Sequence, residues 1–117
     1  LKNILHRGPD YNSYFIDEKS KTFLGHARLS ILDLSKNGNQ PMHYQNDELI
    51  IIFNGEIYNY LDLKEKYLIN EKNIKSTTDT EVILFLFKKF HSSFVNYLNG
   101  MFCIIIYEKK NQKFICV

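Results

Sequence analysis

The sequence has little that would mark a nucleic-acid-binding, membrane-spanning or metal-binding protein. Its net charge is only +2 over 117 residues, which is too small to indicate binding to nucleic acid or to an anionic membrane surface. No apolar run approaches the roughly 20 residues that cross a bilayer, and the first residues do not form a signal peptide. The four histidines lack the spacing of a zinc site, so we expect no metal in this domain.

Cysteine is also scarce. Cys103 and Cys116 lie within apolar runs that are typical of strands, and they have neither metal-site nor redox-pair spacing. We therefore expect two buried free thiols in a reducing compartment, which indicates a cytoplasmic location.

Arginine is the scarcest of the charged residues. Among the 15 basic residues, only Arg7 and Arg28 are arginines. Either they occur by chance, or they mark places where a planar, two-pronged guanidinium is needed.

The composition is otherwise that of a globular chain. A hydrophobic content of 44%, with 15% aromatic residues, is ample for the core of one domain or of a part of one. The sequence begins with leucine rather than methionine and stops within a strand-like run, which is typical of a fragment.

One stretch, residues 49–59, combines a buried strand with chemically useful groups. Residues 49–53 are continuously apolar, as in a strand that is covered on both faces. Asn54 and Gly55 follow, and this pair predicts a sharp turn. A carboxamide beside an uncrowded backbone N–H can form an oxyanion hole, whereas a turn without chemistry is the alternative if the run stands alone.

The remaining pattern predicts an α+β arrangement. Residues 60–67 have a helical period, and Thr78 with Glu81 matches a capping box that starts a helix over residues 82–90. A short helix is expected at residues 94–98, and strands are expected at residues 13–17, 23–28, 102–107 and 114–117. Strands that are apolar on both faces need cover on each side, which two packed sheets with helices outside would supply.

Four motifs together carry a family resemblance. They are His6-Arg7-Gly8-Pro9-Asp10 and the stretches 28–33, 54–59 and 78–84, with a weaker fifth at 98–102. Their types and order resemble the glutaminase domain of the glutamine-dependent asparagine synthetases, which are class II glutamine amidotransferases of the N-terminal-nucleophile type. The amidotransferases that make glucosamine phosphate or phosphoribosylamine share the Asn-Gly element but lack the first motif.

The resemblance implies a four-layer αββα sandwich, of which residues 1–117 would be an incomplete type 2 domain. It also implies site roles. Arg28 would bind the α-carboxylate of glutamine, and Asp79 with Glu56 would receive its α-ammonium group. Asn54 and Gly55 would form the oxyanion hole. The pocket wall would be formed by Leu29, Ser30, Ile31 and Leu32. Arg7 would serve as structural support.

The implied activity is hydrolysis of glutamine to glutamate and ammonia without a cofactor in this domain. The family's nucleophile is the cysteine at the mature N-terminus, which is not among these residues, and neither Cys103 nor Cys116 would replace it. The isolated chain is therefore expected to be inactive. The parent protein would carry a synthetase domain beyond Val117 that binds ATP, Mg and aspartate, and it could form a homodimer.

Two alternatives stay open at this point. The chain could come from another class II amidotransferase with a different acceptor. It could also come from a homologue that only binds glutamine or serves a structural purpose.

Overall fold

The computed structural model describes all of residues 1–117. The strands are β1 (Tyr11–Asp17), β2 (Thr22–Arg28), β3 (Met42–Tyr44), β4 (Leu49–Ile57), β5 (Gly100–Glu108) and β6 (Lys113–Cys116). The α-helices are α1 (Tyr60–Leu68) and α2 (Asp79–Phe90), and short 3-10 helices occupy Lys2–Arg7, Lys36–Gly38 and His91–Tyr97. The predicted helices and strands are thus present, except that the short helix expected at residues 94–98 is replaced by the 3-10 segment His91–Tyr97.

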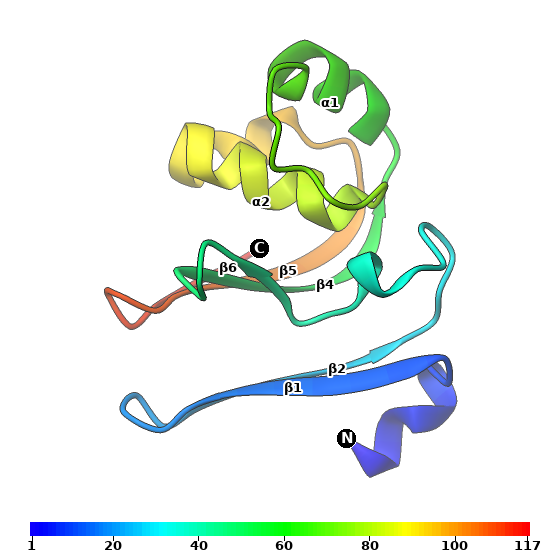
Figure 1. Ribbon diagram of the computed structural model, residues 1–117, viewed down its shortest axis with the longest axis vertical. Coiled ribbons are helices and arrows are strands. Elements are labelled where there is room, and N and C mark those ends of the chain that lie inside the picture. The colour runs from blue at the N-terminus through cyan, green and yellow to red at the C-terminus, as the bar shows by residue number, and fades with distance from the viewer.

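The elements form three layers (Figure 1). The four-stranded antiparallel sheet, in the order β3-β4-β5-β6, lies between the helices and the β1–β2 hairpin. The larger core cluster packs between this sheet and the helices, and a smaller one around Phe15, Leu24 and Tyr107 packs between the two sheets. The predicted packing of two sheets is confirmed, with helices outside the four-stranded sheet, so these residues form three of the four layers that the αββα resemblance implies. The outer face of the hairpin, which carries the stacked rings of Tyr14 and Phe23, is exposed.

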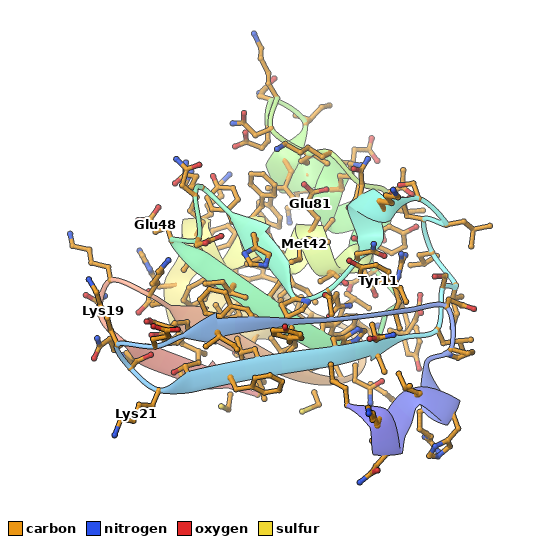
Figure 2. All side chains as sticks on the ribbon, turned by 60° about the horizontal axis from the view of Figure 1, so that its bottom comes forward. Tyr11, Lys19, Lys21, Met42, Glu48 and Glu81 are labelled. Carbon is orange, nitrogen blue, oxygen red and sulfur yellow. The ribbon has the colours of Figure 1, made fainter.

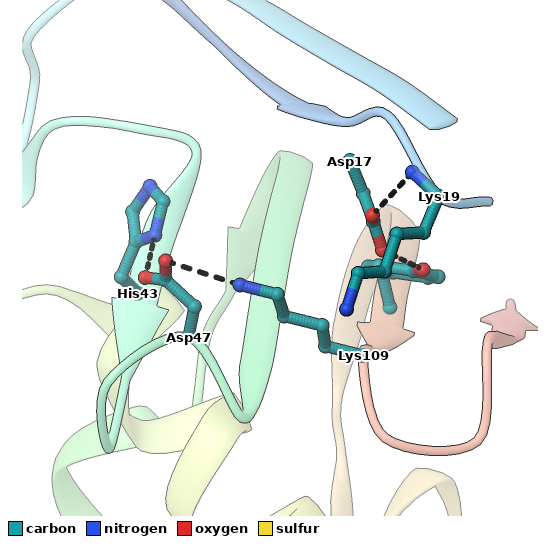
Figure 3. Close-up of polar contacts among 6 residues, drawn as sticks. Asp17, Lys19, His43, Asp47 and Lys109 are labelled. Carbon is teal, nitrogen blue, oxygen red and sulfur yellow. Dashed lines mark hydrogen bonds and ion pairs between the residues drawn. The ribbon is translucent and has the colours of Figure 1, made fainter. Parts of the chain in front are cut away.

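The hairpin is fastened to the central sheet at its turn end. Figure 2 shows β1 and β2 crossing in front of the larger sheet. The buried hydroxyl of Tyr107 on β5 donates to the Asp17 carboxylate at 2.7 Å, and the same carboxylate accepts the backbone N–H of Lys19 at 3.1 Å (Figure 3). At the neighbouring loop, Asp47 lies 2.6 Å from His43 and 3.6 Å from Lys109. These contacts lie at the end of the sheet away from Arg28, and the hydrogen bond from Tyr107 to Asp17 joins the two layers there.

The predicted turn at Asn54 and Gly55 is wrong. β4 continues through both residues to Ile57, and Asn54, Gly55 and Glu56 pair with residues of β5. Gly55 has φ +147°, and a Cβ there would lie 2.1 Å from the carbonyl oxygen of Met101. The glycine therefore permits an extended, close approach of two strands rather than a reversal of the chain.

The start of α2 follows its predicted capping signal in part. The Thr78 hydroxyl accepts the backbone N–H of Glu81 at 3.3 Å, as expected for an N-cap. The Glu81 carboxylate does not return to Thr78 and instead accepts the N–H groups of Lys75 and Ser76. The helix start is therefore joined to the segment before it, which fixes where Asp79 lies.

The expectation of buried thiols is wrong, because Cys103 and Cys116 are both exposed. Side chains alternate along β5, so its buried residues Ile104 and Ile106 face the helices while Cys103 faces the other side. The two-stranded hairpin covers that side only in part. The apolar run was therefore no guide to the burial of Cys103, which lies between Phe102 and Ile104.

None of the helices is long and apolar enough to span a membrane.

Candidate functional site

A cavity of about 270 Å³ opens between the end of β2, the edge of β4 and the first turn of α2. Its volume suits a metabolite of amino-acid size rather than a larger ligand. Its charged residues are two arginines and two carboxylates. The residues that line it are Arg7, His26, Ala27, Arg28, Leu29, Ile31, Leu32, Gly38, Gln40, Phe53, Asn54, Gly55, Glu56, Thr78, Asp79 and Thr80.

The β4 edge of the cavity presents a row of backbone N–H groups. β3 pairs with β4 only as far as Ile51, so the edge beyond that residue has no strand neighbour on this side. Strand alternation directs the N–H groups of Phe53, Gly55 and Ile57 to this edge. The Gln40 side chain accepts the N–H of Phe53 at 2.7 Å, and the Asp79 carboxylate accepts the N–H of Ile57 at 3.0 Å. The Gly55 N–H lies between them and faces the cavity.

Asn54 stands beside this free donor. Its side chain is exposed, lines the cavity and forms no hydrogen bond within the chain. A free carboxamide next to an open backbone N–H has the composition of an oxyanion hole, so the chemistry predicted for this pair remains available although the turn is absent.

Arg28 is buried, with 5% of its surface exposed, and organises the loop that follows β2. Its two terminal nitrogens carry four N–H groups, and all four find oxygen acceptors in that loop. The acceptors are the carbonyl oxygens of Leu32, Asp33 and Ser35 and the side-chain oxygen of Asn39. Gly38 makes room for the guanidinium, because a Cβ there would lie 2.3 Å from it.

This arrangement limits how Arg28 can meet a ligand. Only its Nε–H is free of these loop bonds, so a two-pronged grip on a carboxylate requires the loop oxygens to yield. Arg28 forms no ion pair with Asp79, whose oxygens accept the N–H groups of Ile57 and Thr80. Arg7 lines the same cavity, is exposed and has no hydrogen-bond or ion-pair partner, so it is a free cation at the site and supports no other element.

Two neighbouring carboxylates form the acidic side of the cavity. Burial raises the pKa of Asp79 above its ordinary value, against the opposing effect of its backbone hydrogen bonds. The pKa of Glu56 is also raised, first by loss of solvent and then by the charge of Asp79. Two neighbouring carboxylates that are partly removed from water favour the binding of a cation, because its positive charge offsets both the loss of solvent and the repulsion between them.

The raised pKa of Glu56 predicts a pH-dependent cost to the fold. When folding raises the pKa of a carboxyl group, the folded protein loses stability as the pH rises above the ordinary pKa of that group, which is 4.5 for Glu56 in the unfolded chain. We expect Glu56→Gln to increase the free energy of unfolding near neutral pH by less than about 1 kcal/mol, because the pair is partly solvated. The gain should vanish near pH 4.

Urea unfolding at several pH values measures this effect, with Glu65→Gln as the control on the exposed side of α1. A gain for Glu56→Gln that persists unchanged at low pH would contradict the charge explanation.

The loop after β2 is placed by two aspartates. The Asp10 carboxylate accepts the backbone N–H of Ser30 at 2.7 Å, so Ser30 is the one member of the predicted wall that does not line the cavity. Asp33 has φ +52°, and its carboxylate joins Ser35 to the backbone N–H of Thr77. These hydrogen bonds, led by the Ser35 hydroxyl, lower the pKa of Asp33. The loop is thereby tied to the segment that precedes α2.

The cavity also contains residues that the sequence did not single out. Gln40, His26 and Thr80 line it. No group of three or more histidine, cysteine, aspartate or glutamate side chains is placed to hold a metal ion.

Comparison with known proteins adds three findings. A sequence profile described as "Glutamine amidotransferase domain" matches residues 1–117. A Methanocaldococcus jannaschii protein provisionally named asparagine synthetase (glutamine-hydrolyzing) 2 is 44% identical over 98% of this chain, which spans 25% of that protein. The Gibberella zeae protein named amidase chry2 is 36% identical over 98% of this chain, which spans 17% of it.

Among solved structures, the glutamine phosphoribosylpyrophosphate amidotransferase of B. subtilis matches with a TM-score of 0.62. The match covers 75% of this chain and 21% of that one, at 23% identity. At that identity the likeness concerns the fold alone, and it confirms the predicted α+β class.

Proposed function

The chain belongs to the glutamine amidotransferase domain family, and from that we propose that it binds glutamine and supplies the oxyanion hole for its hydrolysis. Residues 1–117 are then part of a type 2 amidotransferase domain. In the whole protein, the ammonia released would amidate aspartate in an ATP- and Mg-dependent synthetase domain, as the names of its asparagine synthetase relatives suggest.

The observation that carries this proposal is the single open donor on the β4 edge. Attack of a thiolate on the carboxamide carbon of glutamine places negative charge on its oxygen. The Gly55 N–H and the Asn54 carboxamide can both donate to that oxygen, and a donor fixed in a strand needs no rearrangement during the reaction. The C–N bond then breaks, ammonia leaves, and water hydrolyses the γ-glutamyl thioester.

The charges around the cavity fit the other end of an amino acid. Asp79 and Glu56 would receive the α-ammonium group, and the carboxylate would meet Arg28 through its Nε–H. Arg7 offers a second cation at the same opening. Leu29, Ile31 and Leu32 would wall the aliphatic part of the substrate. This distribution is complementary to a free amino acid and unfavourable to a peptide, whose α-groups are uncharged.

The nucleophile is assigned to neither cysteine of this chain. Cys103 pairs across the sheet with Asn54 and is exposed, yet neither it nor Cys116 lines the cavity. The proposed nucleophile is the family's N-terminal cysteine, so the 117 residues alone should release no glutamate.

The acceptor of the ammonia decides between the main proposal and its rival. A relative named an amidase matches this chain over the same extent as one named an asparagine synthetase, which favours a different acceptor as the second candidate. The test is incubation of the native protein with amide-labelled glutamine, ATP, Mg and aspartate.

Label recovered in the side-chain amide of asparagine is the expected result. Glutamine consumption that yields only free ammonia, unchanged by aspartate, would move the protein to the rival class. An absence of both glutamine binding and hydrolysis would leave a structural homologue.

A further inference from the structure

The oxyanion hole depends on a strand edge that lacks a strand neighbour. β3 ends its pairing with β4 at Ile51, two residues before Phe53. Phe53 and Ile57 are buried, so their edge-facing backbone groups cannot rely on water and need partners from side chains. Whatever satisfies those groups also sets where the edge lies.

Three side chains complete the hydrogen bonding that β3 leaves open. Gln40 accepts the N–H of Phe53 at 2.7 Å, and His26 lies 3.3 Å from the carbonyl oxygen of the same residue. Because a carbonyl oxygen only accepts, the geometry assigns the proton of the His26 ring to Nε2. Asp79 accepts the N–H of Ile57 at 3.0 Å. Gly55 is therefore held from both sides, with its own N–H left for the cavity.

Gln40 also reaches the opposite wall. Its amide nitrogen donates to the Thr80 hydroxyl at 3.3 Å, and the Thr80 N–H donates to the Asp79 carboxylate at 2.8 Å. The residue is 6% exposed, and its backbone carbonyl is fixed by the Ser13 hydroxyl at 2.8 Å. Through its carboxamide and its backbone carbonyl, Gln40 thus connects the β4 edge, the first turn of α2 and β1.

We propose that Gln40 is a positioning residue for the oxyanion hole. Its side chain replaces the missing β3 partner at Phe53 and holds the β4 edge where the Gly55 N–H meets the substrate oxygen. The kinetic test of this proposal rests on the proposed function, because it measures glutamine hydrolysis. The placement of the strand edge can be measured by hydrogen exchange, which does not depend on that function.

The test compares three variants of the native protein. Gln40→Met keeps the length of the side chain and removes both polar ends. Ser13→Ala removes only the hydrogen bond to the Gln40 backbone carbonyl and lies outside the cavity, so it is the matched control. Gln40→Glu keeps an acceptor for Phe53 and can also accept from the Thr80 hydroxyl.

Kinetics of glutamine hydrolysis separate positioning from simple stability. A displaced donor slows the chemistry, so Gln40→Met should lower kcat by about ten- to a hundredfold. Its KM should stay within about twofold, because the groups proposed to bind the substrate ends are unchanged. Ser13→Ala and Gln40→Glu should both keep kcat within about threefold. A Gln40→Met variant with normal kcat, or one that loses kcat only in step with its folded fraction, would overturn the proposal.

Amide hydrogen exchange gives an answer that does not depend on activity. The Phe53 amide should exchange at least about tenfold faster in Gln40→Met and at nearly the original rate in Gln40→Glu. If Gln40→Met fails to fold, Gln40→Glu decides. A folded Gln40→Glu variant in which the Phe53 amide is no longer protected from exchange and kcat is lost would refute the role of Gln40 as acceptor. A third outcome is that the unmodified protein hydrolyses no glutamine, while Gln40→Met and Gln40→Glu change the exchange of the Phe53 amide as expected. In that case the proposed function is wrong, but the role of Gln40 in placing the strand edge is supported.

Discussion

Replacement of Asn54 by alanine is expected to slow glutamine hydrolysis by about a hundredfold or more, because loss of one oxyanion-hole donor costs roughly 3 kcal/mol in the transition state. The Asn54 side chain forms no hydrogen bond within the chain, so its loss should not weaken the fold. Glutamine affinity should change little, because the ground-state carbonyl is a weaker acceptor than the oxyanion.

Steady-state kinetics and urea unfolding of the native protein test this together. Asparagine formation from added ammonia serves as the internal control, because that route does not pass through the thioester. A kcat that stays within about twofold, in a folded variant, would reduce Asn54 to a strand residue without a catalytic contact.

Arg28→Lys is expected to reduce both stability and glutamine binding. An exposed ion pair would tolerate this change at a cost of about 0–1 kcal/mol. Arg28 is instead buried and satisfies four loop oxygens, whereas the lysine ammonium has three donors in a different geometry. Loss of a hydrogen bond to a charged group costs on the order of 1.5–3 kcal/mol, and a loosened loop also displaces the cavity wall.

The measurements are urea unfolding and glutamine affinity, with Arg7→Lys as the matched control. Arg7 has no partner, so that variant should keep full stability. If Arg28→Lys lost stability but bound glutamine normally, Arg28 would be a loop organiser only, and the proposed carboxylate contact would pass to Arg7. If Arg28→Lys kept both its stability and its glutamine affinity, the four hydrogen bonds to the loop would contribute nothing measurable to either.

Local signals in the sequence located most elements correctly. The apolar run of β4 and the Thr78 cap of α2 each depend on residues that are close in the chain. The α+β class follows from these elements because strands buried on both faces need two covering layers.

The sequence failed where a residue's environment is set by distant segments. Asn54 and Gly55 read locally as a turn, but β5 lies so close to Gly55 that only glycine fits in an extended strand. Cys103 is exposed although the next residue in the apolar run, Ile104, is buried, because the two side chains lie on opposite faces of the strand. Gln40 has no local signal at all, since its partners Phe53 and Thr80 are 13 and 40 residues away.

The residues that the sequence singled out can be compared with the cavity lining, while their role in binding or catalysis stays a prediction. The motif residues do meet around one cavity, yet their hydrogen bonds differ from the simplest expectation. Arg28 could be singled out as a rare arginine, but its four bonds to the following loop depend on that loop folding back over it. Asp79 similarly serves a backbone N–H of β4 as well as the acidic side of the cavity.

The central claim is that this cavity binds free glutamine at both of its charged ends and hydrolyses its amide. The most direct test supplies the native protein with L-glutamine, with N-acetyl-L-glutamine and with L-glutamine whose α-carboxyl is amidated. We expect glutamate and ammonia in equal amounts from L-glutamine, and kcat/KM lower by about a hundredfold or more for each blocked compound, because either one leaves buried charges unpaired. Equal rates on all three compounds, or no glutamate from L-glutamine with a folded protein, would contradict the account.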